Sequence, residues 1–110
     1  MRPFAARLTR QPIPFDAAAA RDAEAAFADL APELRALLAG AAGCSPHLRG
    51  LMLREAAWLR AALSLSPETA LAAVLAPLDA AGDDVPAALR AAKRRVGLLV
   101  ALADLGGVWP

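Results

Sequence analysis

The stretch that decides the fold is LRAAKRRVGLLVALADLGGVWP, which occupies residues 89–110. Successive residues of an α-helix advance by about 100° around its axis. At that spacing one narrow stripe carries the apolar residues Leu89, Ala92, Val96, Leu99, Val100 and Ala103. The first half is basic elsewhere and therefore amphipathic, whereas the second half places Leu98, Leu102 and Leu105 on the opposite side.

A helix that is apolar nearly all round needs protein on both sides. Because the sequence stops just after Gly106-Gly107, we expect the natural neighbour of this helix to be missing and the chain to be a piece of a larger protein. We expect the isolated chain to self-associate through this face, because exposed apolar patches of this kind mark interfaces. The candidate interface residues are Leu98, Leu102, Leu105 and Trp109.

Upstream, helical spacing recurs between proline and glycine signals. Asp16 is typical of a helix N-cap, and Pro32 interrupts or restarts a helix. Gly40 and Gly43 favour a stop and a loop.

Two later helices begin with Ser-Pro signals, at residues 45–46 and 66–67. The break near Ala56 is not fixed by the sequence, and Pro77 should distort a helix end. The Gly-Asp-Asp run at 82–84 predicts a turn.

These signals predict an all-α fold of about five or six short helices in an irregular bundle. The last helix, Pro86–Leu105, is expected to be the longest and most buried. Residues 1–15 are expected to form an extended lead-in, and residues 16–110 a single helical subdomain. A chain of 110 residues suffices for one domain with a core.

Composition excludes several classes of function. The formal net charge of +1 predicts no nucleic-acid partner. The longest apolar run, residues 96–103, is far shorter than the ~20 residues that cross a bilayer, so no membrane span is expected. Cys44 is the only cysteine, which fits a reduced, cytoplasmic setting.

The sequence motifs identify no catalytic, cofactor-binding or metal-binding residue. The sequence contains no HExxH, CxxC, GxSxG or phosphate-binding glycine loop. Cys44 and His47 could in principle form a dyad, but they lack an orienting third group. Asp83-Asp84 is more typical of a turn and a cap than of a cation site.

The dense basic cluster is Arg90, Lys93, Arg94 and Arg95. It is either a solvated helix face or a docking surface for acidic groups on a partner domain or for phosphate, because arginine forms forked hydrogen bonds with carboxylates and phosphates. Asp104 lies in an otherwise apolar turn, so we expect its carboxylate to be bonded to a basic residue or to backbone N–H groups.

Three segments of the chain resemble a known family. They are KRRVGLLVALADLGGVWP at residues 93–110, SPHLRGLMLRE at 45–55 and RLTRQPIPFD at 7–16. Together they are similar to the N-terminal helical region of the bacterial bifunctional glutamine synthetase adenylyltransferase and adenylyl-removing enzyme, in its alphaproteobacterial form. Relatives commonly carry proline where this chain has Ala56, which leaves the helix break at that point open.

The resemblance implies a larger enzyme with two nucleotidyltransferase domains that act on a tyrosine of glutamine synthetase and so regulate nitrogen assimilation. It implies ATP and magnesium as cofactors of the whole enzyme. It also implies as partners the downstream catalytic domain of the same polypeptide, glutamine synthetase and a PII-type signal protein. The GGxEL and Asp-x-Asp motifs that hold metal and phosphate are absent here, so no catalytic residue is carried over and the chain alone is expected to be inactive.

Two hypotheses remain from the sequence. In the first, the chain is the non-catalytic helical leader of the first, deadenylylating half of such an enzyme and packs on its catalytic domain. In the second, it is a free-standing helical interaction or dimerisation module whose apolar face meets another protein.

Overall fold

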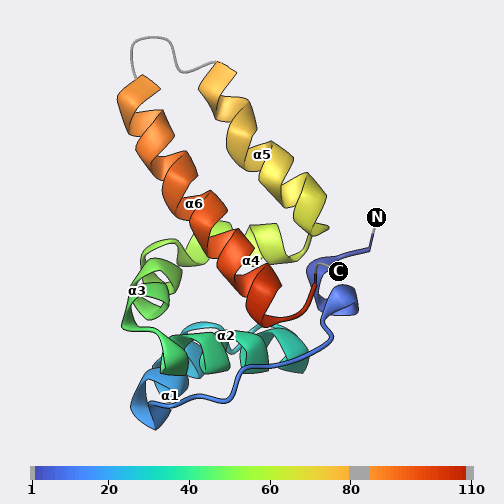
Figure 1. The fold of residues 1–110 in the computed structure, drawn as a ribbon, viewed down its shortest axis with the longest axis vertical. Coiled ribbons are helices and arrows are strands. Elements are labelled where there is room, and N and C mark those ends of the chain that lie inside the picture. The colour runs from blue at the N-terminus through green and yellow to red at the C-terminus, as the bar shows by residue number, and fades with distance from the viewer. Residues whose placement is uncertain (1, 80–84, 109–110) are drawn as a thin grey trace.

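The structure, a computed structural model, describes residues 2–79 and 85–108, and all regular secondary structure within them is helical. A 3₁₀ helix, η1, precedes six α-helices in this part of the chain (Figure 1). Their bounds are η1 Phe4–Arg7, α1 Ala17–Ala26, α2 Pro32–Cys44, α3 Pro46–Arg54, α4 Ala56–Leu63, α5 Pro67–Asp79 and α6 Val85–Leu105. The all-α prediction is confirmed, and α6 is the longest of these helices at 21 residues.

The helices form a base and a projecting hairpin. Helices α1 to α4 make the base, and α5 and α6 run side by side out of it, which gives extents of 42 × 29 × 24 Å (Figure 1). The C-terminal half of α6 enters the base and contacts α2 and α3. The largest side chains of the core are Phe4, Phe27, Leu37, Leu38, Met52, Leu59, Leu63, Leu98, Leu99 and Leu102, each less than 2% exposed or nearly so.

The helix starts lie where the sequence signals placed them. Asp16 Oδ1 accepts hydrogen bonds from the backbone N–H groups of Ala18 and Ala19 at 3.0 and 3.1 Å. Ser45 Oγ and Ser66 Oγ each accept a backbone N–H from the residue three positions later, at 3.2 Å in both cases. Each cap satisfies donors that a helix N-terminus leaves without an intrahelical partner.

The expected loop at Gly40 and Gly43 is wrong, because both glycines lie inside α2. Their role is close approach: a Cβ at Gly40 would overlap the backbone of Pro12, and one at Gly43 would lie 2.8 Å from Pro14 Cα. The extended N-terminal segment around Pro12 and Pro14 therefore packs directly against the face of α2 that carries the two glycines. Tertiary contact outweighs the low helix propensity of glycine here.

The sequence left open where a helix breaks near Ala56. In the structure the break lies at Glu55, between the end of α3 and the start of α4. Glu55 leaves the helical conformation, with φ −105° and ψ 25°. Its carboxylate contacts two arginines of α6. The break therefore coincides with a long-range contact, which local sequence signals do not encode.

Helix α6 ends in a Schellman motif that also anchors the N-terminal segment. Gly107, at φ 63°, donates to Asp104 O at 3.1 Å, and Val108 donates to Ala103 O at 2.9 Å. The backbone N–H groups of Thr9 and Arg10 donate to the carbonyl of Gly106, at 2.8 and 3.1 Å. The N-terminal segment, expected as an extended lead-in, thus includes η1, and its backbone is hydrogen-bonded to the C-terminal end of α6.

The expectation that the last helix is the most buried is corrected. In α2 every residue from Leu37 to Gly43 is buried, whereas Leu89 and Val100 of α6 are 44% and 45% exposed. Leu89 belongs to the N-terminal half of α6, which stands outside the base beside α5 (Figure 1). Helix α5 continues past Pro77 to Asp79, and the expected turn at 82–84 lies outside the described residues.

Candidate functional site

The candidate interface on the second half of α6 is largely covered by this chain itself. Leu98 and Leu102 have no exposed surface, and Leu105 packs partly buried against the same core. Trp109 lies outside the described residues. Helices α2 and α3, together with the N-terminal segment around Leu8, supply the second neighbour that this helix requires. The two central leucines are therefore core residues in this conformation and not an open interface, which removes the physical reason for self-association through them.

The basic cluster separates into two pairs with different roles. Arg94 Nε donates to Glu55 Oε1 at 3.3 Å, and Arg95 Nε donates to Glu55 Oε2 at 3.0 Å. The Arg95 guanidinium also lies over the Trp58 ring, 5.2 Å from its centroid. These two arginines connect α6 to the junction between α3 and α4.

Glu55 is only 7% exposed and remains in its charged form for a clear reason. Burial alone would raise its pKa. The hydrogen bonds and positive charges of Arg95 and Arg94 outweigh that effect and hold the pKa of Glu55 below its usual range. This cluster is therefore a satisfied structural ion pair, with no reactive group left over.

Arg90 and Lys93 are exposed and form no ion pair with the described residues. Asp104 differs from expectation, since its side chain is exposed and has no hydrogen-bond partner within the described residues. Its backbone carbonyl accepts from Arg10 Nη2 at 2.6 Å and from the Gly107 N–H at 3.1 Å. An exposed carboxylate keeps its hydration, so it needs no protein partner.

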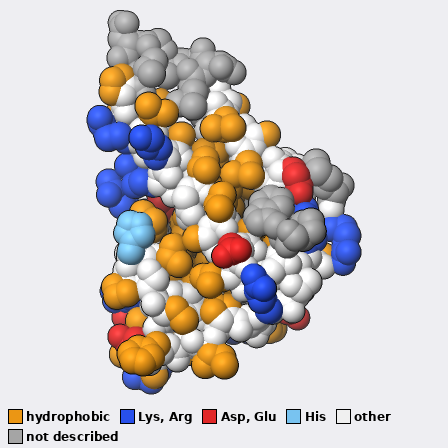
Figure 2. Space-filling view, in the orientation of Figure 1, with side chains coloured by type: hydrophobic (Ala, Val, Ile, Leu, Met, Phe, Trp, Pro, Cys, Tyr) orange, Lys and Arg blue, Asp and Glu red, His pale blue; other side chains and the backbone are white. Residues whose placement is uncertain are grey.

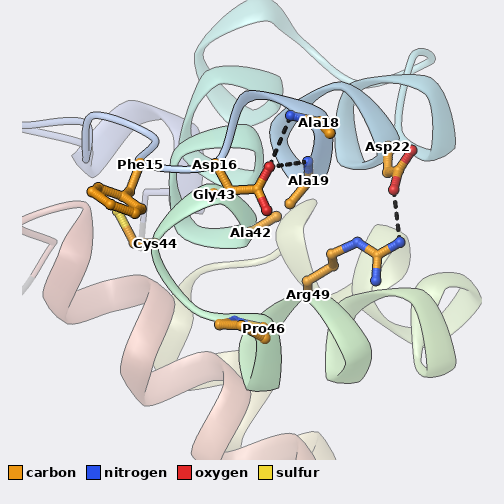
Figure 3. A pocket seen from close by; sticks show the side chains of 10 residues that line it. All are labelled: Phe15, Asp16, Ala18, Ala19, Asp22, Ala42, Gly43, Cys44, Pro46 and Arg49. Carbon is orange, nitrogen blue, oxygen red and sulfur yellow. Dashed lines mark hydrogen bonds and ion pairs between the residues drawn. The ribbon is translucent and has the colours of Figure 1, made fainter.

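One hollow of about 460 Å³ lies where the N-terminal strand meets α1, α2 and α3 (Figure 3). Three of its polar side chains form contacts within the chain, although the Nε of Arg49 is buried without a hydrogen-bond partner among the described residues. Asp16 caps α1, Asp22 pairs with Arg49 at 2.6 Å, and the Cys44 thiol donates to the Ile13 carbonyl at 3.1 Å. This arrangement holds the strand and three helices together and leaves no free acid or base aimed into the hollow.

The possible dyad of Cys44 and His47 is not assembled. Cys44 lines the hollow of Figure 3, whereas His47 lines a different hollow, between α3 and α6. Within the described residues, no three His, Cys, Asp or Glu side chains are grouped to hold a metal ion.

A second surface crosses three helices, and we call it the cross-helix groove. It consists of three adjoining hollows of about 450, 360 and 330 Å³. The first two share His47 and Leu51, and the second and third share Lys93 and Gly97. Its residues are Pro46, His47, Leu48, Gly50, Leu51 and Arg54 of α3, Leu75 of α5, and Leu89, Ala92, Lys93, Arg94, Val96, Gly97 and Ala101 of α6. In Figure 2 hydrophobic side chains run down the visible face, with basic side chains and the histidine at its left edge.

Of this surface the sequence pointed only to Lys93 and Arg94 as a possible docking surface. The apolar floor was missed because Leu75 and Leu89 have the helical spacing of core residues. The one signal that could have found it is a pair of glycines inside helices, Gly50 and Gly97.

Comparison with curated proteins finds relatives of one kind. The bifunctional glutamine synthetase adenylyltransferase/adenylyl-removing enzyme of Rhodopseudomonas palustris strain TIE-1 is 38% identical over 95 residues, which span 81% of this chain. This chain is homologous to one segment of that enzyme. The enzyme of the same name from Rhodopseudomonas palustris strain HaA2 is 40% identical over 91 residues, and that from Bradyrhizobium sp. strain BTAi1 is 36% identical over 96. The resemblance inferred from the sequence is thereby confirmed.

The match covers a small part of each relative. The chain spans 10% of the TIE-1 and BTAi1 enzymes and 9% of the HaA2 enzyme. No protein-family model matches the chain, and no solved structure matches it significantly. None of the described helices combines the length and the apolar composition needed to span a bilayer.

Proposed function

We propose that this chain is a non-catalytic helical segment of a glutamine synthetase adenylyltransferase/adenylyl-removing enzyme. The observation that carries the proposal is its homology to about a tenth of such enzymes over most of its own length. As the names of the relatives state, those proteins both add adenylyl groups to glutamine synthetase and remove them. The catalytic motifs of the family are absent from this sequence, so the segment acts through its shape and surface.

In this role the segment packs on the first catalytic domain and helps to form the face that meets glutamine synthetase. Two features support a scaffold. The extended segment at residues 8–15 contacts both α2 and the end of α6, and the buried Glu55 connects α6 to the junction of α3 and α4. ATP, magnesium and a PII-type signal protein belong to the whole enzyme in this proposal, and the setting is the cytoplasm.

A chimera tests the proposal. The matched segment of the Rhodopseudomonas palustris TIE-1 enzyme is deleted, or replaced by this chain, and both activities are measured on purified glutamine synthetase. We expect deletion to impair removal of adenylyl groups more than their addition, and replacement to restore it. The proposal fails if this chain restores neither activity while the enzyme's own segment, reinserted at the same junctions, restores both.

A further inference from the structure

We propose that the cross-helix groove binds an amphipathic helix that carries carboxylates beside an apolar strip. In this proposal the helix comes from another part of the enzyme in which the segment acts. The inference therefore rests on the proposed function and specifies the surface and the partner chemistry.

The first argument is exposed apolar area. Leu75 and Leu89 are 50% and 44% exposed and line one hollow of the groove, between α5 and α6. Leu48 and Leu51 line the adjoining hollow and are only partly buried. Apolar side chains gathered in this way, with polar groups at the edge, mark a protein interaction site.

The second argument is charge. Among the residues that the structure describes, none that lines the three hollows is acidic, and the rim carries His47, Arg54, Lys93 and Arg94. Arg94 shares the carboxylate of Glu55 with Arg95, whereas Lys93 and Arg54 form no ion pair with the described residues. A partner that brings carboxylates to this rim is therefore complementary.

The third argument comes from two glycines that the chain itself does not require. Gly50 in α3 and Gly97 in α6 are exposed, and a Cβ built on either would meet nothing within 4 Å. Glycine inside a helix is less stable than alanine by about 0.5–1 kcal/mol. Both glycines line the groove, whereas Gly40 and Gly43 are explained by contacts within the chain. An external backbone that approaches closely accounts for them.

The source of the partner follows from the free carboxylates available. Asp22, Asp29, Glu55 and Glu68 are already paired with arginines of the same chain. The described carboxylates without an arginine partner include Glu24, Glu33 and Asp104, which lie one each on α1, α2 and α6, so these helices of a second copy do not offer a row of free carboxylates. About nine-tenths of each relative lies outside the matched segment and can supply the helix. A groove between helices accepts a helix through apolar anchors spaced along one face.

The experiment titrates the ¹⁵N-labelled chain with the Rhodopseudomonas palustris TIE-1 enzyme lacking its matched segment. We expect chemical-shift changes to concentrate at residues 46–54, 75 and 89–101. Gly97→Ala should raise Tm by a few degrees through helix propensity while weakening binding by about tenfold or more. Lys93→Glu should also weaken binding, whereas the charge-matched control Arg21→Glu, on α1 outside the groove, should not.

Four results would overturn the inference. If binding occurs with shift changes elsewhere, the groove is wrong while the proposed function survives. If Gly97→Ala raises Tm and leaves the affinity unchanged, the glycine is not a contact. If the groove signals depend on the concentration of the labelled chain alone, the occupant is a second copy. Complete absence of binding also refutes the groove, and the chimera assay then decides separately whether the proposed function stands.

Discussion

Replacement of Glu55 by glutamine should destabilise the fold, because this side chain joins the α3–α4 junction to α6. The change removes two charge-assisted hydrogen bonds, of 3.3 and 3.0 Å. Hydrogen bonds to charged groups contribute roughly 1.5–3 kcal/mol each when well formed. Here one bond is long, and Arg94 and Arg95 keep 30% and 36% of their side-chain surface exposed, so they regain water when the carboxylate is lost.

We therefore expect Glu55→Gln to lower the free energy of unfolding by about 2 kcal/mol, less than the loss of a fully buried ion-pair partner. For a domain of this size that corresponds to a fall in Tm of roughly 8 °C. The measurement is urea and thermal unfolding at pH 7, followed by far-ultraviolet circular dichroism. A double-mutant cycle with Arg95→Met should show a coupling energy of about 1 kcal/mol. A loss below about 0.5 kcal/mol, the range of ordinary surface changes, would refute the assignment of Glu55 as a tie.

The pH dependence gives an independent check on the same residue. Because the pKa of Glu55 is lowered by folding from its ordinary value of 4.5, its contribution is fully present above that pH. The contribution is lost as pH falls through the lower pKa of the folded state. The difference in Tm between wild type and Glu55→Gln should therefore be constant at roughly 8 °C from pH 5 to 7 and should shrink below about pH 4. A difference in Tm that grows as the pH falls would contradict the conclusion that folding lowers the pKa of Glu55.

Three further substitutions test the packing. Gly40→Ala should destabilise by about 2 kcal/mol, because the added methyl overlaps the Pro12 backbone, and unchanged urea unfolding would show that the strand does not lie there. Phe4→Ala should cost about 3–5 kcal/mol in the same assay, since its side chain is fully buried, and a loss near zero would mean that η1 is detached from the core. Glu68→Gln breaks a partly exposed pair with Arg7, so Tm should change little and the change should vanish in high salt. A large, salt-independent loss would contradict this.

The boundary between what the sequence predicts and what it misses lies in the range of the interactions. The caps at Asp16, Ser45 and Ser66 were predictable because each involves residues two or three positions apart. The basic residues of the groove were also found, since charge is visible in the sequence. The hollow floor was not, because Leu75 has the spacing of a core residue and only the arrangement of α5 beside α6 leaves it exposed.

The sequence by itself determined the all-α class, the helix starts, and the homology to a segment of a glutamine synthetase-modifying enzyme. Those properties depend on local backbone hydrogen bonds and on residue identity. Tertiary structure alone decided that α2 runs through Gly43, that a helix breaks at Glu55, and that Leu102 is covered within the chain. In each case a segment distant in sequence makes the contact, and its packing or charge outweighs the local preference.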